Sequence, residues 1–375
     1  MPVKYRVAVI GHTGRGNYGH GLDVVWKNFE QCEVVAVADA DEKGLGEAVK
    51  RLADGKRKTS PRPYADYRRM LDEATPQVVA ICPRWLGQHR EMVIAAAERG
   101  IHIYMEKPLC RNLREADEMV AACEKRDVKL AVAHQTRYSP RLQAARELIE
   151  EGKLGTILEL RGRGKEDQRG GGEDLWVLGS HVMNLIDYFG GEAKWCFGHV
   201  EQNGKPVTKA DVKPGNEEIG PLAGDHVVAM YGMDSGATAY FGSRRAMGGG
   251  GDGRFGLQIF GSKGVMEVLF GNLPSVQFLA DPNWSPGRSK AEWVPVTSAG
   301  LGKPEPHADS GIAGGNVLAV KDLLSAIEND RQPECSIYEA RTTIEMIAGV
   351  FESHRVGGPV SFPLKTRENP LTLLA

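Results

Sequence analysis

Short apolar runs and amphipathic segments alternate regularly through residues 1–136. The apolar runs are rich in Val, Ile and Ala, and most are followed by a stretch whose apolar residues recur at helical spacing. Repeated strand–helix units of this kind are typical of a parallel sheet covered by helices on both faces. We expect strands at Tyr5–Ile10, Cys32–Ala38, Gln77–Ile81, Ile101–Met105 and Val128–Ala133, and helices at Leu22–Phe29, Glu42–Leu52, Tyr67–Ala74, Gln88–Arg99 and Leu113–Lys125.

The pattern changes after residue 137, where hairpin signals replace the strand–helix alternation. Val227–Gly232 and Ala237–Arg244 flank a turn at 234–236, and Leu257–Phe260 precedes a second turn at 261–264. Helices are expected at Arg141–Glu151, Val317–Asn329 and Tyr338–Arg355. The pattern predicts an α/β chain of two domains. Residues 1–136 form a Rossmann fold, and residues 137–375 form an α+β domain with a large, mostly antiparallel open sheet.

One loop of the second part has an unusual composition. Gly248–Gly253 reads GGGGDG, which is typical of a flexible segment. A mobile lid over a site and a plain surface loop both fit this composition. We favour the surface loop.

Composition and charge exclude several classes of function. The chain has 375 residues, 41% of them hydrophobic and 26% charged, and its net charge is 47 − 49 = −2. Such a balance gives no drive toward nucleic acid or an anionic membrane. No apolar run approaches the ~20 residues of a membrane span, and Met1–Ile10 passes directly into a strand without a signal-peptide pattern.

The cysteines and histidines do not form a metal-binding pattern. The six cysteines are scattered, which predicts unpaired thiols in a reducing cytoplasm. His12 and His20 flank a glycine-rich turn, and with His89 and His181 they raise the question of a metal site. Because no ligand spacing joins them, we expect no metal, and we expect His12 and His20 to face the cofactor or solvent.

The first apolar strand runs into a glycine-rich turn, Val7–Gly16, which reads VAVIGHTGRG. Glycines at such a turn let the backbone approach a dinucleotide pyrophosphate, and a following helix offers its free N–H groups to the phosphates. The usual G-x-G-x-x-G spacing is met at its ends, but Thr13 replaces the middle glycine. The turn residues expected to contact the cofactor are Gly11, Thr13, Gly14, Arg15 and Gly16.

Asp39 strengthens this interpretation. It ends the second strand, 23 residues after Gly16, where an acidic residue can bind the ribose hydroxyls of the adenosine. A carboxylate there repels a 2′-phosphate, so NAD is favoured over NADP. The alternative is that Asp39 is only a turn residue.

Several further motifs together resemble the Gfo/Idh/MocA oxidoreductase family. Met105–Leu109 reads MEKPL directly after a strand, Arg137–Pro140 reads RYSP, and Ile259–Gly264 reads IFGSKG. The resemblance covers nearly the whole chain. It implies a Rossmann domain followed by a sheet domain that builds a homodimer or homotetramer. It also implies that Pro83, His89, Glu106 and Lys107 lie at the cofactor.

Lys107 is the first catalytic candidate that the resemblance suggests. A lysine at the carboxyl end of a parallel strand lies on the edge where ligands bind, and its ammonium can stabilise an alkoxide or polarise a carbonyl. The resemblance also implies a cis peptide bond between Lys107 and Pro108. The alternative is a solvated surface lysine.

His181 is the second candidate, because its helix resembles the family's D-x-G-x-H-x-x-D motif. A histidine can accept a hydroxyl proton near neutral pH. Here Val177 and Asn184 stand where family members often carry Asp, so the usual carboxylate partner of the histidine is missing. Residues that we consider as supporting groups are Asp174, Tyr138 and Glu166.

The sequence therefore predicts an NAD-dependent dehydrogenase or reductase that acts on the CH–OH group of a small polyhydroxylated substrate, a sugar, sugar derivative or cyclitol. Two alternatives stay open. An NAD-dependent glycosidase or lyase would oxidise a sugar carbon transiently and keep its NAD bound. A non-catalytic NAD-binding regulator would bind a protein or nucleic acid, but Lys107, His181 and the absence of a basic patch argue against it.

Overall fold

The computed structural model describes residues 4–53, 59–249 and 253–375, and these fall into two compact units. The N-terminal unit comprises residues 1–133, 217–219 and 312–341, and the C-terminal unit comprises the rest. This division differs from a single boundary at residue 136, because two later segments pack with the N-terminal unit. The loop at Gly248–Gly253 lies largely outside the described residues.

The N-terminal unit contains a parallel sheet with the strand order β3-β2-β1-β4-β5-β6 among the described residues. Its strands follow the apolar runs of the sequence, and Val7, Val9, Val37 and Val79 are fully buried. The strands are β1 (Tyr5–Ile10), β2 (Cys32–Ala38), β3 (Arg62–Tyr64), β4 (Val78–Ile81), β5 (His102–Met105) and β6 (Leu130–Val132). β3, which contains Pro63, was not among the strands expected from the sequence. A proline is tolerated there because β3 is an edge strand.

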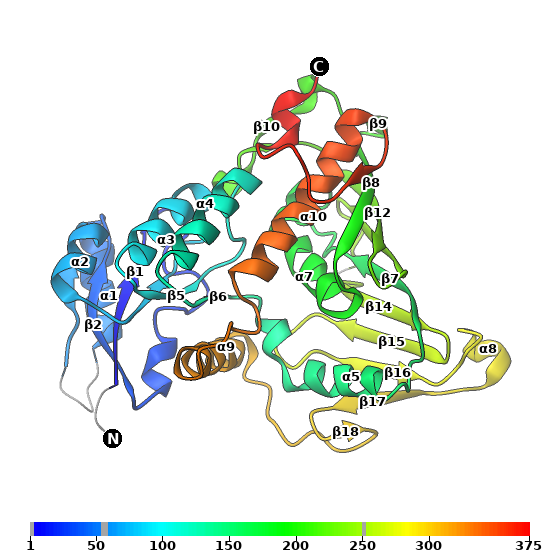
Figure 1. Ribbon diagram of the computed structural model, residues 1–375, viewed down its shortest axis with the longest axis horizontal. Helices are drawn as coiled ribbons and strands as arrows, with labels where there is room; N and C mark the ends of the chain where they lie inside the picture. The colour runs from blue at the N-terminus through cyan, green and yellow to red at the C-terminus, as the bar shows by residue number, and fades with distance from the viewer. Residues whose placement is uncertain (1–3, 54–58, 250–252) are drawn as a thin grey trace. The chain divides into compact units, whose positions relative to one another are not determined.

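Three helices of the N-terminal unit begin at residues with capping side chains, Asp41, Asp66 and Asn112. Asp41 accepts a hydrogen bond from the amide of Gly44, and Asn112 accepts one from the amide of Glu115. The helices are α1 (Glu42–Leu52), α2 (Tyr67–Ala74), α3 (His89–Ala97), α4 (Leu113–Glu124) and α9 (Gly311–Glu328). Figure 1 shows α3 and α4 side by side, as their mutual packing requires.

The predicted helix Leu22–Phe29 is wrong. This segment consists of turns and one short 3-10 helix, η1, at Val25–Asn28. Gly19 and Gly21, which precede this segment, adopt φ of 62° and 85°, so no right-handed helix includes them. The expected helix N-terminus is therefore absent from the described glycine-rich turn, and the turn itself must provide any phosphate contacts.

The C-terminal unit contains a large sheet with the order β18-β17-β16-β15-β14-β7-β13-β12-β8-β19, in which β9 also pairs with β8. Its pairs are antiparallel except β13 with β7, which confirms the predicted fold class. The strands are β7 (Ile157–Arg163), β8 (Ala193–Gln202), β9 (Lys205–Pro206), β12 (His226–Met233), β13 (Thr238–Arg244), β14 (Gly256–Gly261), β15 (Gly264–Leu269), β16 (Val276–Leu279), β17 (Trp293–Thr297), β18 (Gly300–Leu301) and β19 (Val360–Ser361). A separate small pair joins β10 (Lys213–Pro214) and β11 (Pro221–Leu222).

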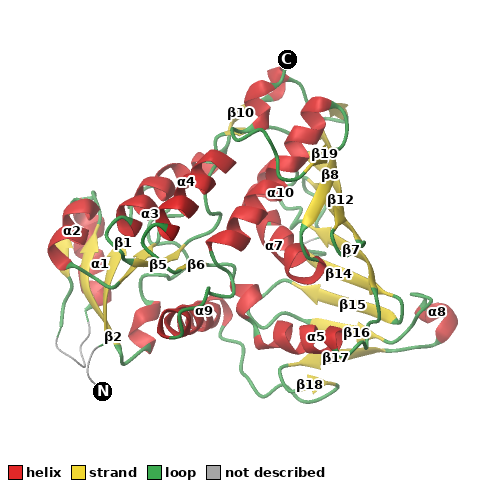
Figure 2. Cartoon of the chain, in the orientation of Figure 1, coloured by secondary structure: helices red, strands yellow, loops and turns green. Residues whose placement is uncertain are grey.

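Helices pack against one face of the large sheet, as Figure 2 shows. A side chain at Gly162 of β7 would meet Val182 of α7, and one at Gly198 of β8 would meet Val350 of α10. On the opposite face, Phe197, Val228 and Tyr240 are each about two-fifths exposed. The helices of this unit are α5 (Pro140–Glu150), α6 (Gly172–Val177), α7 (Gly179–Gly190), α8 (Pro286–Ser289) and α10 (Ile337–Val356), whose first turn belongs to the N-terminal unit.

Candidate functional site

The polar residues of the N-terminal unit gather where its parallel strands end. Gly11 follows β1, Asp39 follows β2 and Lys107 lies two residues after β5. A cavity of about 180 Å³ opens there, and Gly11, His12, Asp39 and Gln88 are among its lining residues. Its place at the carboxyl edge of the sheet is where α/β folds bind nucleotides.

The glycine-rich turn closes on itself between His12 and Asn17, whose backbone groups exchange two hydrogen bonds of 3.0 Å. The Asn17 side chain also accepts the amide of Gly14 at 3.0 Å. Gly16 has φ of 88°, and a Cβ there would lie 2.3 Å from the backbone nitrogen of Arg84. The turn thus needs glycine at this position, both for its conformation and for the close approach of a second chain segment.

Asp39 fixes the conformation of this turn. Its carboxylate accepts the amide of Thr13 at 3.0 Å, the hydroxyl of Thr13 at 2.7 Å and the amide of Asp41 at 3.0 Å. The side chain is buried but lines the cavity. Thr13 therefore does more than replace a glycine, because its hydroxyl ties the turn to the end of β2.

Two arginines beside the turn face two carboxylates. Arg15 forms an ion pair with Glu218, and Arg84 lies 3.7 Å from Glu217. Glu217 and Glu218 both adopt left-handed φ, 53° and 55°, which is uncommon for residues with side chains. Nothing in the sequence pattern pointed to these two glutamates, because they are about 200 residues from Arg15.

Lys107 is nearly buried, and its peptide bond to Pro108 is cis, as the resemblance implied. The preceding Glu106 is fully buried and accepts hydrogen bonds from the amide of His20 at 2.8 Å and from its Nδ1 at 2.7 Å. Burial alone would raise the pKa of Glu106, but the hydrogen bonds and charge of His20, together with Lys107, hold that pKa below its ordinary value. Glu106 thus joins the glycine-rich segment to the end of β5.

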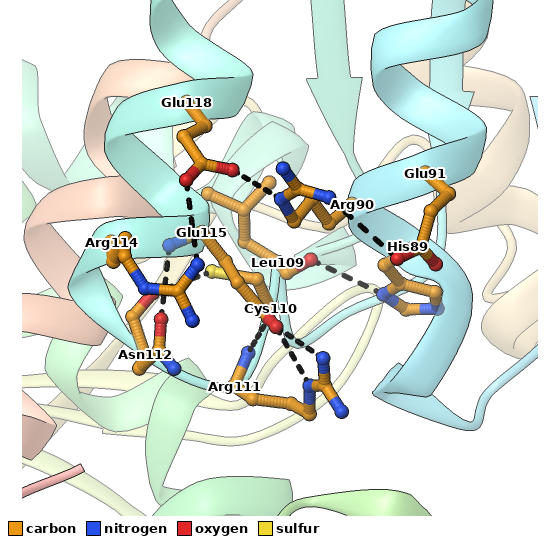
Figure 3. Close-up of polar contacts among 10 residues, drawn as sticks. All are labelled: His89, Arg90, Glu91, Leu109, Cys110, Arg111, Asn112, Arg114, Glu115 and Glu118. Atoms are coloured by element: carbon orange, nitrogen blue, oxygen red, sulfur yellow. Dashed lines mark hydrogen bonds and ion pairs between the residues drawn. The ribbon is translucent and has the colours of Figure 1, made fainter. Parts of the chain in front are cut away.

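His89 braces the same loop from the other side. Its Nε2 lies 2.7 Å from the carbonyl oxygen of Pro83, and its Nδ1 lies 3.0 Å and 3.2 Å from those of Pro108 and Leu109. Figure 3 shows the ring pointing from the start of α3 to Leu109. Because the ring is fully buried, the structure gives His89 a supporting position behind Lys107. A contact of His89 or Pro83 with the cofactor stays a prediction.

The segment after Leu109 is also held firmly. Asn112 caps α4, and Glu115 accepts the amide of Arg111 at 3.0 Å and its Nε at 2.9 Å (Figure 3). Arg90 of α3 pairs with Glu118 of α4. These contacts hold the residues that follow Leu109 at the start of α4 and join α3 to α4.

His181 lies in the first turn of α7, where it meets a residue that the sequence did not single out. Its Nδ1 is 3.2 Å from the Nδ1 of His134, and the two rings are nearly perpendicular with centroids 4.8 Å apart. Phe270 packs on His181 with its centroid at 4.5 Å. His134 and His181 are 47 residues apart, so no local spacing in the sequence links them.

Asp174 is fully buried, and its described partners are neutral. Its carboxylate accepts the hydroxyl of Ser243 at 2.5 Å and the amides of Glu166 at 3.1 Å and Lys165 at 3.3 Å. Burial raises the pKa of Asp174, although these hydrogen bonds oppose the rise. The chain breaks its helical course at Leu178, between α6 and α7, so Asp174 and His181 do not share one continuous helix.

The other two supporting candidates have different surroundings. Glu166 is buried, with its carboxylate accepting the amide of Arg244 at 3.0 Å and the guanidinium of Arg254 at 2.7 Å. Tyr138 is half-buried at the end of the short helix η3 (Gln135–Tyr138). Each role in chemistry stays a prediction.

Among the described residues, no group of three or more His, Cys, Asp or Glu side chains is placed to hold a metal ion. Within the same ranges, no helix combines the length and apolarity needed to cross a bilayer. All six cysteines are buried free thiols.

The chain matches two protein-family models. The model of the oxidoreductase family with an NAD-binding Rossmann fold covers residues 5–134, and the model of the Gfo/Idh/MocA C-terminal domain covers residues 142–267. Together they span more than half of the chain.

Two curated relatives are dehydrogenases. A myo-inositol 2-dehydrogenase of Thermotoga maritima is 26% identical over 260 residues, which cover 69% of this chain and 73% of that protein. A levoglucosan dehydrogenase of Pseudarthrobacter phenanthrenivorans is 29% identical over 227 residues, which cover 54% of this chain and 56% of that protein. A solved levoglucosan dehydrogenase in complex with NADH and levoglucosan has the same fold, with a TM-score of 0.75 and 22% identity over 97% of this chain and 100% of that one.

Proposed function

Because the chain belongs to the Gfo/Idh/MocA family of oxidoreductases, whose N-terminal domain is an NAD-binding Rossmann fold, we propose that it oxidises a secondary hydroxyl, or reduces the matching ketone, of a sugar, sugar derivative or cyclitol. The observation that carries this proposal is Lys107. It stands at the carboxyl edge of the parallel sheet on a loop braced by both Glu106 and His89. The dehydrogenase activities of the two curated relatives support the substrate class.

The residues of the N-terminal unit fit a dinucleotide. The cavity beside Gly11 and Asp39 suits the adenosine half, and the glycines of the turn leave the backbone without side chains at its closest approaches. When bound, NAD supplies the hydride acceptor or donor, and the protein supplies position and charge. In this proposal Lys107 stabilises negative charge on the substrate oxygen, and His181 takes or returns the hydroxyl proton.

A turnover screen tests the activity. Sugars, cyclitols and glycosides are offered with NAD, and both NADH and sugar products are measured. We expect the amount of NADH formed to equal the amount of polyol oxidised. Release of a sugar product without net NADH, with NAD retained by the protein, would instead identify a glycosidase or lyase. Binding of NAD without any turnover, together with NAD-dependent binding of a partner protein or nucleic acid, would identify a regulator.

We propose that NAD binds more tightly than NADP. Asp39 lines the cavity, and its carboxylate would repel a 2′-phosphate. Its hydrogen bonds to Thr13 and Asp41 hold the group in place but leave its negative charge at the cavity wall. Titration with both cofactors decides the preference. Equal or tighter binding of NADP would remove Asp39 from this role.

We propose that the protein forms a homodimer or homotetramer through the open face of the large sheet. Phe197 and Tyr240 flank Met230 in one row across β8, β12 and β13, which makes an exposed apolar area on adjacent strands. Light scattering gives the assembly size. Phe197→Lys with Tyr240→Lys should reduce it, and an unchanged size would exclude this face.

We also place the protein in the cytoplasm. Its six buried free thiols suit a reducing compartment, because none of them is paired in a disulfide. Fractionation of cells that produce the untagged protein tests this, and recovery outside the cytoplasm would contradict it.

A further inference from the structure

His134 directly contacts the proposed proton acceptor, and neither the sequence motif nor the family comparison assigns it a role. It lies immediately before η3, which packs against α7. Its imidazole and that of His181 are 2% and 5% exposed, so the contact between them is shielded from water. A hydrogen bond between two buried imidazoles is stronger than the same bond in solvent.

The geometry restricts how protons are distributed over the pair. The hydrogen bond joins two Nδ1 atoms 3.2 Å apart, so one ring must donate and the other must accept. If His181 donates through Nδ1–H, its Nε2 carries a lone pair when the ring is neutral and a proton when the ring is charged. If His134 donates instead, the neutral His181 ring carries its proton on Nε2 and has no lone pair there. Only the first arrangement serves a proton acceptor at Nε2.

His134 is in hydrogen-bond contact with the Nδ1 of His181, so it can set this tautomer. Of the ionisable groups on the elements packed against α7, Asp174 of α6 is bonded to Ser243, and Arg137 of η3 lies 3.3 Å from Asp187 of α7 itself. On β7, the alternation of the strand puts Glu159, Arg161 and Arg163 on the face opposite Gly162, which approaches Val182 of α7. On β14, Leu257 and Ile259 are buried apolar residues.

We propose that His134 is a positioning residue that replaces the missing carboxylate, because its Nδ1 accepts the Nδ1–H of His181 and keeps the Nε2 of His181 as the proton acceptor. The inference rests on the proposed function, in which the O–H bond of the substrate breaks, its electron pair stays on oxygen and its proton passes to His181. Phe270 holds the other side of the ring, with its centroid 4.5 Å away. His134 itself gains no proton, since two adjacent imidazolium ions would repel each other.

A neutral partner has a different consequence from a carboxylate. It fixes the tautomer, but it stabilises the imidazolium form of His181 less than a negative charge would. The proton acquired by His181 is therefore released more readily than from a carboxylate–histidine pair. Replacing His134 by Asp should make this difference measurable.

The first experiment observes His181 directly and requires no substrate. Nitrogen-15 NMR of the histidine-labelled full-length protein, saturated with NAD, reports the tautomer and titration of each ring. We expect Nδ1–H in wild-type His181, retention of this tautomer in His134→Gln, and its loss in His134→Leu. His134→Asp should raise the pKa of His181 by about 1–3 pH units, the usual effect of an adjacent opposite charge.

His199→Gln is the matched control, because His199 pairs with Glu201 on a distant strand of the same unit. It should leave the His181 signals unchanged. Nε2–H in wild-type His181, or an identical His181 titration in the Gln, Leu and Asp variants of His134, would overturn the proposal. If His134→Leu fails to fold, the Gln and Asp variants still decide the question.

The second experiment measures the pH dependence of kcat/KM with the polyol that gives most NADH in the turnover screen. We expect His134→Leu to lower kcat about 10-fold or more with NAD affinity unchanged, and His134→Gln to recover most of the loss. In His134→Asp the acid limb of the kcat/KM profile should move to higher pH, by the same amount as the pKa of His181 measured by NMR. If this limb does not move, His134 is not a positioning residue.

The two proposals fail separately. If His181→Asn keeps full turnover while the NMR signals respond to His134 as expected, the pairing is correct and the assignment of the proton acceptor is wrong. If His181→Asn abolishes turnover while the NMR signals ignore His134, the function stands and this inference falls.

Discussion

Glu106 of the N-terminal unit and Asp174 of the C-terminal unit are both completely buried carboxylates, and they are held in opposite ways. Glu106 of the N-terminal unit has a pKa below its ordinary value, and Asp174 of the C-terminal unit has a pKa above it. Both are desolvated and both accept several hydrogen bonds. The difference is that Glu106 faces the imidazole of His20 and is followed by Lys107, whereas the described donors to Asp174 are a hydroxyl and two amides.

This comparison shows that burial alone does not set the charge of a carboxyl group. A cationic partner keeps a buried carboxylate ionised, while neutral donors compensate only part of the desolvation cost. The edge with Glu106 is thus built to hold fixed charges beside a phosphate-bearing cofactor. Asp174 is held by neutral donors, and in the proposed function the proton transfer falls to His181 on the neighbouring helix α7.

The largest expected effect is that of His181→Asn. It should lower the chemical step about 10²–10⁴-fold, the contribution typical of a positioned general base. Asp174→Asn should have a much smaller effect on the same step, because the Asp174 carboxylate is bonded to Ser243. Single-turnover kinetics with a true substrate measure both, and NAD affinity is the control. If both variants slowed the chemical step equally, His181 and Asp174 would not have the different roles proposed here.

Lys107→Ala tests the charged edge of the other unit. It should lower turnover by about 10²-fold or more while NAD affinity stays within a few-fold, because it removes one group that stabilises developing charge. Lys107→Arg is the matched variant that keeps the charge but changes its geometry. Near-normal turnover in Lys107→Ala would make this lysine structural.

Glu106→Gln and Asp174→Asn should respond to pH in opposite directions. Glu106 has a lowered pKa, so its ionisation stabilises the folded state above about pH 4.5, and this contribution is lost as the pH falls. We expect Glu106→Gln to lower the free energy of unfolding by about 1–3 kcal/mol, the contribution of a buried charged hydrogen bond. This difference from wild type should become smaller as the pH falls.

Asp174 has a raised pKa, so its contribution is complete below about pH 3.8 and is lost as the pH rises through the folded-state value. The difference in unfolding free energy between wild type and Asp174→Asn should therefore become smaller as the pH increases. Denaturant unfolding across the acid range gives both curves. Parallel curves would refute the difference between the two carboxylates.

The smallest effect is expected at Glu218. Its ion pair with Arg15 is partly exposed, with about one third of each side chain accessible. Glu218→Gln should tighten NAD binding about 2–5-fold, because a partly exposed ion pair contributes up to about 1 kcal/mol and its loss leaves Arg15 available to the phosphates. Glu173→Gln, a carboxylate of the C-terminal unit bonded to Asn216, is the control. Weaker binding by Glu218→Gln would mean that Glu218 supports the bound cofactor.

The sequence by itself determined the elements whose signals are local. Strands such as Cys32–Ala38 and helices such as Glu42–Leu52 and Tyr67–Ala74 lie where the hydrophobic pattern predicted them. The ends of parallel strands placed Gly11, Asp39 and Lys107 on one edge, because consecutive strand–helix units leave little topological choice. The motifs that carry the family resemblance are likewise contiguous in the chain.

Only the tertiary structure decided what depends on residues distant in sequence. Leu22–Phe29 has a helical pattern, but in the structure it consists of turns and the short 3-10 helix η1. His181 proved to contact His134, 47 residues earlier, and Arg15 proved to pair with Glu218. Periodicity reports how one segment buries its own apolar face, whereas such pairs are set by the packing of different segments against one another.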